Sequence, residues 1–260
     1  MSADAVATLL WLAGGLLLTA AFGALIRIGR EANRAAGCDW GHPVTNVIDG
    51  LNRVFLRTWH RCDIQTVPLP PDGPALVVAN HVSGLDPLLI LAACHRPVHF
   101  IIAREEYERF GLTWLFRLGE CIPVDRSSRD DSAFRAALDA LAAGKVVALF
   151  PSGRIHLPEE GPARLRRGVA RLSRLSGAPV FPCRIDGVRL PGHVLPAVFL
   201  PGRARLRAFS SIACARLGER ACLAALAPLI NGERDVPMPE EGTVRDVRGP
   251  IGEGGVDDAG

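Results

Sequence analysis

Residues 75–95 read ALVVANHVSGLDPLLILAACH and predict a strand, a tight loop and a helix in that order. The apolar run at 75–80 has the length of a buried strand, and the longer apolar run at 87–95 has that of a helix. A Ser-Gly turn lies between them, and Pro87 after Asp86 is a common way to begin a helix. This stretch therefore indicates a strand whose end leads directly into a helix.

The same alternation of strand-like and helix-like runs continues along the chain. Further strands are predicted at 98–103, 121–125, 145–150 and 179–185, and two later runs, 194–199 and 204–209, are expected to extend the sheet. Helices are predicted at 110–119, 131–144, 164–177 and 221–230. Alternating strands and helices are typical of an α/β fold, here with a mixed, mainly parallel sheet flanked by helices.

The composition limits the functional classes. The chain has 260 residues, enough for one sizeable α/β domain with its own core. Its net charge is only +3, so no strong positive field indicates a nucleic-acid partner. Its seven cysteines are odd in number and include no C-x-x-C pair. We therefore expect no disulfide framework, no metal site and a reducing compartment.

An uncharged apolar run occupies residues 5–26. As a helix it would extend about 33 Å, and the hydrocarbon core of a bilayer is about 30 Å thick. Three arginines follow within residues 27–34, whereas the only charge before the run is Asp4. A secretory signal peptide needs a basic start, which is absent here, and a buried core helix is the other alternative. We predict a single-pass transmembrane helix at 1–30, in the cell inner membrane with the following domain on the cytoplasmic face.

Two flanking segments are expected to differ from the main domain. Apolar residues recur at helical spacing within 44–62, so we assign 31–66 as an amphipathic, membrane-proximal helical segment. Its apolar face would pack on the domain or lie on an anionic membrane surface, and both roles stay open. The tail at 236–260 is rich in Pro, Gly and acidic residues and is predicted to be disordered.

Two polar clusters directly follow strand-like runs, at the carboxyl ends of strands where sites in α/β sheets gather. The first extends from Asn80 to Asp86, and the second from Phe150 to Arg154. In the first, a tight turn separates His81 from Asp86, so the carboxylate can hold one ring nitrogen while the other acts as a base. The alternatives are a helix-capping role for Asp86 and a structural role for His81.

The stretch NHVSGLD (80–86) resembles the N-H-x(4)-D signature of the glycerolipid acyltransferases, the family that includes 1-acylglycerol-3-phosphate acyltransferase. Further blocks resemble those of the family, and their order and spacing agree over residues 70–190. These blocks are HFIIAREEY (99–107), GECIPVDR (119–126), FPSGR (150–154), ARLRRG (163–168) and APVFPCRIDG (178–187). The resemblance implies an acyltransferase domain, which we place at 67–235.

The resemblance also implies a reaction and a set of site residues. The expected reaction moves a fatty acyl group from acyl-CoA or acyl-carrier protein to the hydroxyl of lysophosphatidic acid, with no other cofactor. His81 is the implied general base, and Asp86 orients it. Backbone groups near Gly153 are candidate oxyanion donors. The implied substrate-binding residues are Asn80, Arg104, Arg126, Ser152, Gly153 and Arg154, and the arginines would hold the acceptor's phosphate.

One block departs from the family pattern. Ser152 stands where the family has Glu, and Arg154 follows Gly153 without an intervening Thr. A serine hydroxyl is a weaker, neutral substitute for a carboxylate. The acceptor is therefore left open: another lysophospholipid or an aminolipid is an alternative. A non-catalytic lipid-binding protein at the membrane is a further alternative.

Overall fold

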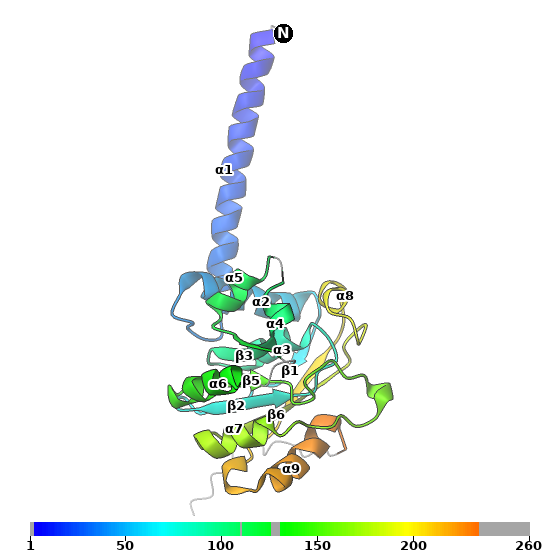
Figure 1. The fold of residues 1–260 in the computed structure, drawn as a ribbon. Coiled ribbons are helices and arrows are strands. Elements are labelled where there is room, and N and C mark those ends of the chain that lie inside the picture. The colour runs from blue at the N-terminus through cyan, green and yellow to red at the C-terminus, as the bar shows by residue number, and fades with distance from the viewer. Residues whose placement is uncertain (1–2, 110, 126–130, 234–260) are drawn as a thin grey trace, which may run out of the picture.

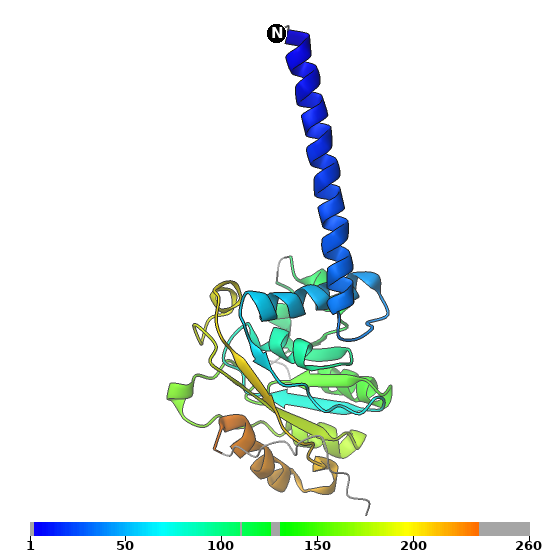
Figure 2. The same cartoon turned by 180° about the vertical axis from the view of Figure 1, so that it is seen from behind.

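The computed structural model describes residues 3–109, 111–125 and 131–233, except for the side chains of residues 3–10 and 13. A seven-stranded sheet with helices on both faces forms the body of the molecule. A long N-terminal helix stands away from this body (Figures 1 and 2). The predicted disordered tail at 236–260 lies outside the described residues.

The sheet has the strand order β1-β7-β6-β2-β5-β3-β4. Only β6 and β7 pair antiparallel, whereas every other neighbouring pair is parallel. The prediction of a mixed, mainly parallel sheet is therefore confirmed. The strands are β1 Asp63–Ile64, β2 Ala75–Ala79, β3 Val98–Ala103, β4 Ile122–Val124, β5 Val146–Leu149, β6 Val180–Asp186 and β7 Arg205–Ala208.

Two hydrophobic cores cover the two faces of the sheet. Successive side chains of a strand point to opposite faces, and in β2 Val77 belongs to the core under α2 and α3, whereas Leu76 belongs to the core under α6, α7 and α9. The helices are α1 Ala3–Ala35, α2 Pro43–Thr58, α3 Asp86–Ala93, α4 Arg104–Tyr107, α5 Thr113–Leu118, α6 Ser132–Ala142, α7 Gly168–Ser176, α8 Leu195–Phe199 and α9 Glu219–Asn231, with short 3₁₀ turns η1 Pro158–Glu160 and η2 Cys214–Arg216.

One predicted strand is wrong, and four short elements, β1, α4, η1 and η2, were not predicted. Residues 194–199 were expected to extend the sheet, but Leu195–Phe199 form helix α8. Pro196 lies in the first turn of that helix, where the missing N–H of proline costs no hydrogen bond. Strand β1 and helix α4 have two and four residues, which is too short for a periodic pattern to indicate them.

The cysteine prediction also needs correction. Cys214 and Cys222 form a disulfide, with their Cα atoms 5.1 Å apart. Cys214 lies in η2 and Cys222 in the first half of α9, and both side chains are buried. The chain reverses between these elements and brings together two cysteines whose spacing did not suggest a pair.

Helix α1 presents large apolar side chains to its surroundings. Trp11, Leu12, Leu16, Leu17, Leu18, Phe22 and Leu25 are all more than half exposed. Within the described part of the chain, however, no helix combines the length and mean hydropathy needed to cross a membrane. The predicted membrane-spanning helix at 1–30 is thus not confirmed. Its first side chains lie outside the described part, and beyond the apolar run the helix continues through Arg27, Arg30 and Glu31.

The base of α1 packs on α2 through a close approach at Gly50. A Cβ atom on Gly50 would lie 1.6 Å from the carbonyl oxygen of Ala32, so this contact requires glycine. The predicted amphipathic helix within 44–62 corresponds to α2, whose Leu56 is fully buried in the core beneath it. Helix α2 therefore joins α1 to the domain.

We expect Gly50→Ala to disrupt the packing of α1 on α2, because the added methyl group would overlap backbone atoms. Overpacking of this kind costs about 1–3 kcal/mol. Thermal unfolding and limited proteolysis of the segment at 36–42 should show a lower midpoint or faster cleavage. Gly29→Ala is the matched control, because a Cβ atom there meets nothing within 4 Å. Equal behaviour of the two variants would contradict the assignment.

Candidate active site

The loop between β2 and α3 brings His81 and Asp86 together. His81 Nδ1 lies 2.8 Å from Asp86 Oδ2, and the imidazole is 19% exposed whereas the carboxylate is fully buried. The structure therefore places the two predicted catalytic residues as a hydrogen-bonded pair. Within the described residues, His81 Nε2 makes no hydrogen bond, so this nitrogen is free for a substrate.

The carboxylate of Asp86 is held by the loop that precedes it. Its Oδ2 also accepts hydrogen bonds from the backbone N–H groups of Val82, at 2.6 Å, and Ser83, at 2.8 Å. Its Oδ1 accepts from Ser83 Oγ at 2.8 Å. Every other partner of the Asp86 carboxylate donates a hydrogen bond to it, so we assign the hydrogen between His81 and Asp86 to His81 Nδ1. This assignment leaves Nε2 as the basic nitrogen of the imidazole.

Asp86 does not cap α3. The helix is capped at Leu85 without a side-chain hydrogen bond, and the carboxylate of Asp86 turns back toward Val82 and Ser83. The capping alternative is therefore wrong. Gly84 allows the next segment to lie close, because a Cβ atom there would be 2.6 Å from the carbonyl oxygen of Val194.

The strand next to β2 supports the histidine from the other side. The ring of Phe150, at the end of β5, stacks on the imidazole of His81 with centroids 4.0 Å apart and planes 13° apart. Beyond the same turn, the backbone N–H of His156 donates to the carbonyl oxygen of His81 at 2.8 Å. Apolar stacking and this backbone hydrogen bond restrict the orientation of the ring.

The side chain of Asn80 is fully used inside the protein. Its Nδ2 donates to the carbonyl oxygen of Ile185, and its Oδ1 accepts from the N–H of Ile185, both at 2.7 Å. These two hydrogen bonds tie the end of β2 to β6. The predicted substrate-binding role of Asn80 stays a prediction, but the geometry favours a structural role.

The turn after β5 closes on itself. The N–H of Gly153 donates to the carbonyl oxygen of Phe150 at 2.9 Å, and Ser152 Oγ donates to the carbonyl oxygen of Arg154 at 2.7 Å. Gly153 has φ +74°, a conformation that favours glycine. Because its N–H is engaged in the turn, Gly153 itself does not offer the expected oxyanion donor.

Two of the predicted phosphate-binding arginines have carboxylate partners. Arg154 pairs with Glu160, and this guanidinium is the main cause that lowers the pKa of Glu160 to about 2. Arg104, at the start of α4, lies 3.6 Å from Glu108. Arg104 and Arg154 follow the neighbouring strands β3 and β5, whereas Arg126 lies outside the described residues.

Residues 62–186 match the family model described as Acyltransferase. The domain belongs to the acyltransferase family. The resemblance predicted from the NHVSGLD motif is thereby confirmed, and the His81–Asp86 pair lies inside the matched region. In the described part of this acyltransferase domain, no group of three or more His, Cys, Asp or Glu side chains is placed to hold a metal ion.

Three curated relatives are similar to this acyltransferase domain, and the chain spans less than half the length of each. An uncharacterized protein of Mycobacterium tuberculosis is 31% identical over 157 residues, which cover 54% of this chain and 41% of the relative. A probable 1-acyl-sn-glycerol-3-phosphate acyltransferase of Mycoplasma genitalium is 30% identical over 124 residues, 45% of this chain and 46% of the relative. The N-acylphosphatidylethanolamine synthase of Arabidopsis thaliana is 28% identical over 123 residues, 44% of this chain and 43% of the relative.

A solved structure shares the fold. The crystal structure of the 1-acyl-sn-glycerophosphate acyltransferase of Thermotoga maritima aligns with a TM-score of 0.58 and 22% sequence identity. The alignment covers 75% of this chain and 83% of that chain. The α/β sheet flanked by helices is therefore an arrangement that an acyltransferase structure also has.

Three residues of the acyltransferase site were given no role from the sequence. Ser83 binds the carboxylate of Asp86, Phe150 stacks on His81, and His156 binds the backbone of His81. A signal existed for Ser83, which stands three residues before the aspartate at a spacing that suits a side-chain contact across a turn. The contacts of Phe150 and His156 depend on the pairing of β2 with β5 and had no local signal.

We expect Asn80→Ala to lower the stability of the acyltransferase domain rather than its affinity for an acceptor. The variant leaves the N–H and the carbonyl group of Ile185 without partners, at about 1–3 kcal/mol for each buried group. Thermal unfolding should show a clearly lower midpoint, with the acceptor KM unchanged in the folded fraction. A raised KM at unchanged stability would assign Asn80 to the substrate instead.

Proposed function

We propose that this acyltransferase domain moves a fatty acyl group from a thioester donor to the free hydroxyl of lysophosphatidic acid. The observation that carries the proposal is the 2.8 Å hydrogen bond between His81 and the buried Asp86, which leaves Nε2 of the imidazole unbound. A hydroxyl has too high a pKa to act alone as a nucleophile near neutral pH, so it needs a base in this position.

The proposed reaction has no acyl-enzyme intermediate. His81 Nε2 takes the proton of the acceptor hydroxyl while its oxygen attacks the thioester carbonyl carbon. The buried carboxylate of Asp86 stabilises the imidazolium that forms. As the tetrahedral intermediate collapses, the carbon–sulfur bond breaks, and the imidazolium returns its proton to the leaving thiolate. The products are an ester and a free thiol, and His81 is restored.

Arg104 and Arg154 are the proposed ligands of the acceptor's phosphate, and Arg126 joins them by family resemblance. A guanidinium binds phosphate bidentately, and both described arginines follow adjacent parallel strands. A phosphate at Arg154 would replace Glu160 as its partner. A lysophospholipid with a larger head group or an aminolipid is the second candidate acceptor. Its support is Ser152, which donates to the carbonyl oxygen of Arg154 and supplies no carboxylate.

We expect His81→Ala to lower the rate of acyl transfer about 10²–10⁴-fold without loss of folding, because only the general base is removed. The 260-residue protein in detergent is offered acyl-CoA and acyl-carrier protein thioesters against lysophosphatidic acid, other lysophospholipids and aminolipids. His95→Ala, an exposed histidine at the far end of α3, is the matched control.

Each result of this assay has a definite meaning. Transfer to one acceptor that the His81 variant loses and the His95 variant keeps supports the reaction and identifies the substrate. Undiminished transfer by the His81 variant excludes the proposed base. Lipid binding without transfer from either donor would instead support the non-catalytic alternative.

We also propose that the acyltransferase associates with a membrane through the exposed apolar side chains of α1, with its domain on the cytoplasmic face. Soluble surfaces rarely expose a continuous apolar patch as long as the one between Leu12 and Leu25. We expect a Leu17→Glu/Leu25→Glu variant to float with phospholipid vesicles several-fold less than the unchanged protein. Leu217→Glu, at an exposed leucine after η2, should float normally. Equal flotation of all three proteins would remove α1 from membrane binding.

A further inference from the structure

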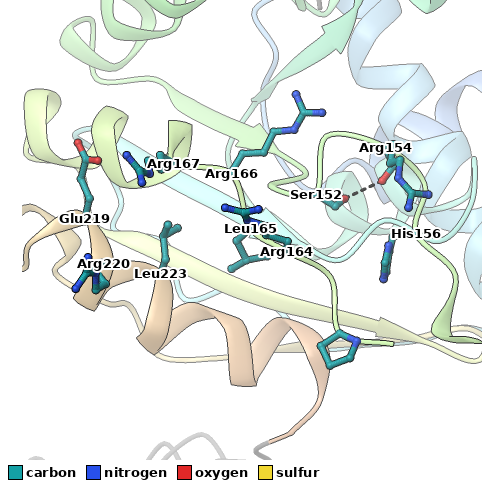
Figure 3. A pocket seen from close by; sticks show the side chains of 11 residues that line it. Ser152, Arg154, His156, Arg164, Leu165, Arg166, Arg167, Glu219, Arg220 and Leu223 are labelled. Atoms are coloured by element: carbon teal, nitrogen blue, oxygen red, sulfur yellow. Dashed lines mark hydrogen bonds between the residues drawn. The ribbon is translucent and has the colours of Figure 1, made fainter. Parts of the chain in front are cut away.

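A cleft of about 890 Å³ opens next to the loop that follows β5 (Figure 3). Three segments of the chain line it: the loop after β5, the residues that lead into α7, and the first turns of α9. Four arginines from the last two segments contribute to the lining, namely Arg164, Arg166, Arg167 and Arg220. We call these four residues the arginine cluster.

Within the part of the chain that the structure describes, the guanidinium groups of the arginine cluster have no partner. Among the described residues, none of the four forms an ion pair or a side-chain hydrogen bond. Glu219 is the acidic residue in the lining, and it pairs with Arg174 at 3.6 Å. Arg154, at the near end of the cleft, pairs with Glu160. The cluster thus concentrates positive charge that folding leaves unneutralised, as a site for a polyanion requires.

The backbone adds to the positive potential of the cleft. Helix α7 is capped by Arg167 and helix α9 by Gly218, and neither cap has a side-chain hydrogen bond. Both helices therefore begin at the cleft with free N–H groups and the positive end of their dipoles. Three independent features, the guanidinium groups and two helix starts, favour the same kind of ligand.

The cleft is connected to the catalytic histidine at one end. The N–H of Arg166 donates to the carbonyl oxygen of Pro151 at 2.8 Å, and its side chain lies over Gly153. His156, which lines the cleft, donates its N–H to the carbonyl oxygen of His81 at 2.8 Å. The other end reaches α9 at Glu219, Arg220 and Leu223 (Figure 3).

We propose that the arginine cluster binds the phosphates of the acyl donor's nucleotide, so that the donor is a coenzyme A thioester. This inference rests on the proposed acyl transfer. Coenzyme A carries a diphosphate and a 3′-phosphate, and its long pantetheine arm separates these groups from the thioester. The cleft adjoins the His81 loop through His156 and carries its arginines as far as α9, which matches this separation. The acceptor has one phosphate close to its reacting hydroxyl, which needs neither four guanidinium groups nor this distance.

The test compares the Arg164→Gln/Arg220→Gln variant with the unchanged protein in steady-state assays. The expected result is a rise of at least about tenfold in the KM for acyl-CoA, from two lost charge-assisted contacts. The kcat and the KM for the acceptor should change less than twofold. Both side chains are exposed, so the thermal midpoint should not move. Arg203→Gln, an exposed arginine outside the cleft, is the matched control and should behave like the unchanged protein.

Three outcomes would overturn the inference. A raised KM for the acceptor alone would assign the cluster to the acceptor's head group. A raised KM for an acyl-carrier protein thioester, with acyl-CoA unaffected, would assign it to an acidic carrier protein. Unchanged constants for all substrates would show that the cluster binds no phosphate of either substrate.

Calorimetric binding of coenzyme A itself separates this inference from the proposed reaction, because it needs no turnover. Coenzyme A should bind the His81→Ala protein normally and should bind the double arginine variant at least about tenfold more weakly. Dephospho-coenzyme A, which lacks the 3′-phosphate, should lose less affinity in the double variant. This pattern without any acyl transfer would keep the nucleotide site and reject the reaction. Acyl transfer from acyl-CoA, with coenzyme A bound equally well by the His81→Ala protein and the double arginine variant, would support the reaction and reject the nucleotide site.

Discussion

The buried carboxylate of Asp86 is the constraint on which the site depends. A charged group without access to water is costly unless its oxygens are hydrogen-bonded, and Asp86 is fully buried. His81, the backbone of Val82 and both donors of Ser83 supply those hydrogen bonds. The loop can meet this demand only by folding back over the start of α3. The same contacts that compensate the buried charge therefore also fix the histidine.

The strands on either side of β2 also restrain the loop that carries His81 and Asp86. This loop follows β2, which lies between β6 and β5. Asn80 ties the loop to β6 by two hydrogen bonds, and Phe150 at the end of β5 stacks on the imidazole of His81. Each neighbouring strand thus restrains one side of the loop. Because β2 is buried on both faces between the two cores, the loop begins from a closely packed strand.

The elements that were predictable share one property, which is that a local pattern determines them. Strand β2 is buried at every position and reads as a continuous apolar run, and the four residues between His81 and Asp86 suffice for a turn that joins them. The prediction of a strand at 194–199 was wrong because the five residues of α8, Leu195–Phe199, are too few for a periodic pattern to distinguish a helix from a strand. The Cys214–Cys222 disulfide and the Asn80–Ile185 hydrogen bonds arise from chain reversal and strand pairing, which no local pattern contains. The arginine cluster is of the same kind, because the starts of α7 and α9 are far apart in the sequence.

The charges around the acyltransferase site divide into two groups with different consequences for binding. Arg104 and Arg154 already have carboxylate partners, so a phosphate that binds them has to displace Glu108 or Glu160. Such an exchange adds little net affinity, but it makes binding selective for a group that matches the guanidinium geometry. The arginine cluster has no such partner among the described residues, so an anion there gains its electrostatic attraction without an exchange. Under the proposed function, the cleft captures the polyanionic donor, and the paired Arg104 and Arg154 discriminate between acceptors.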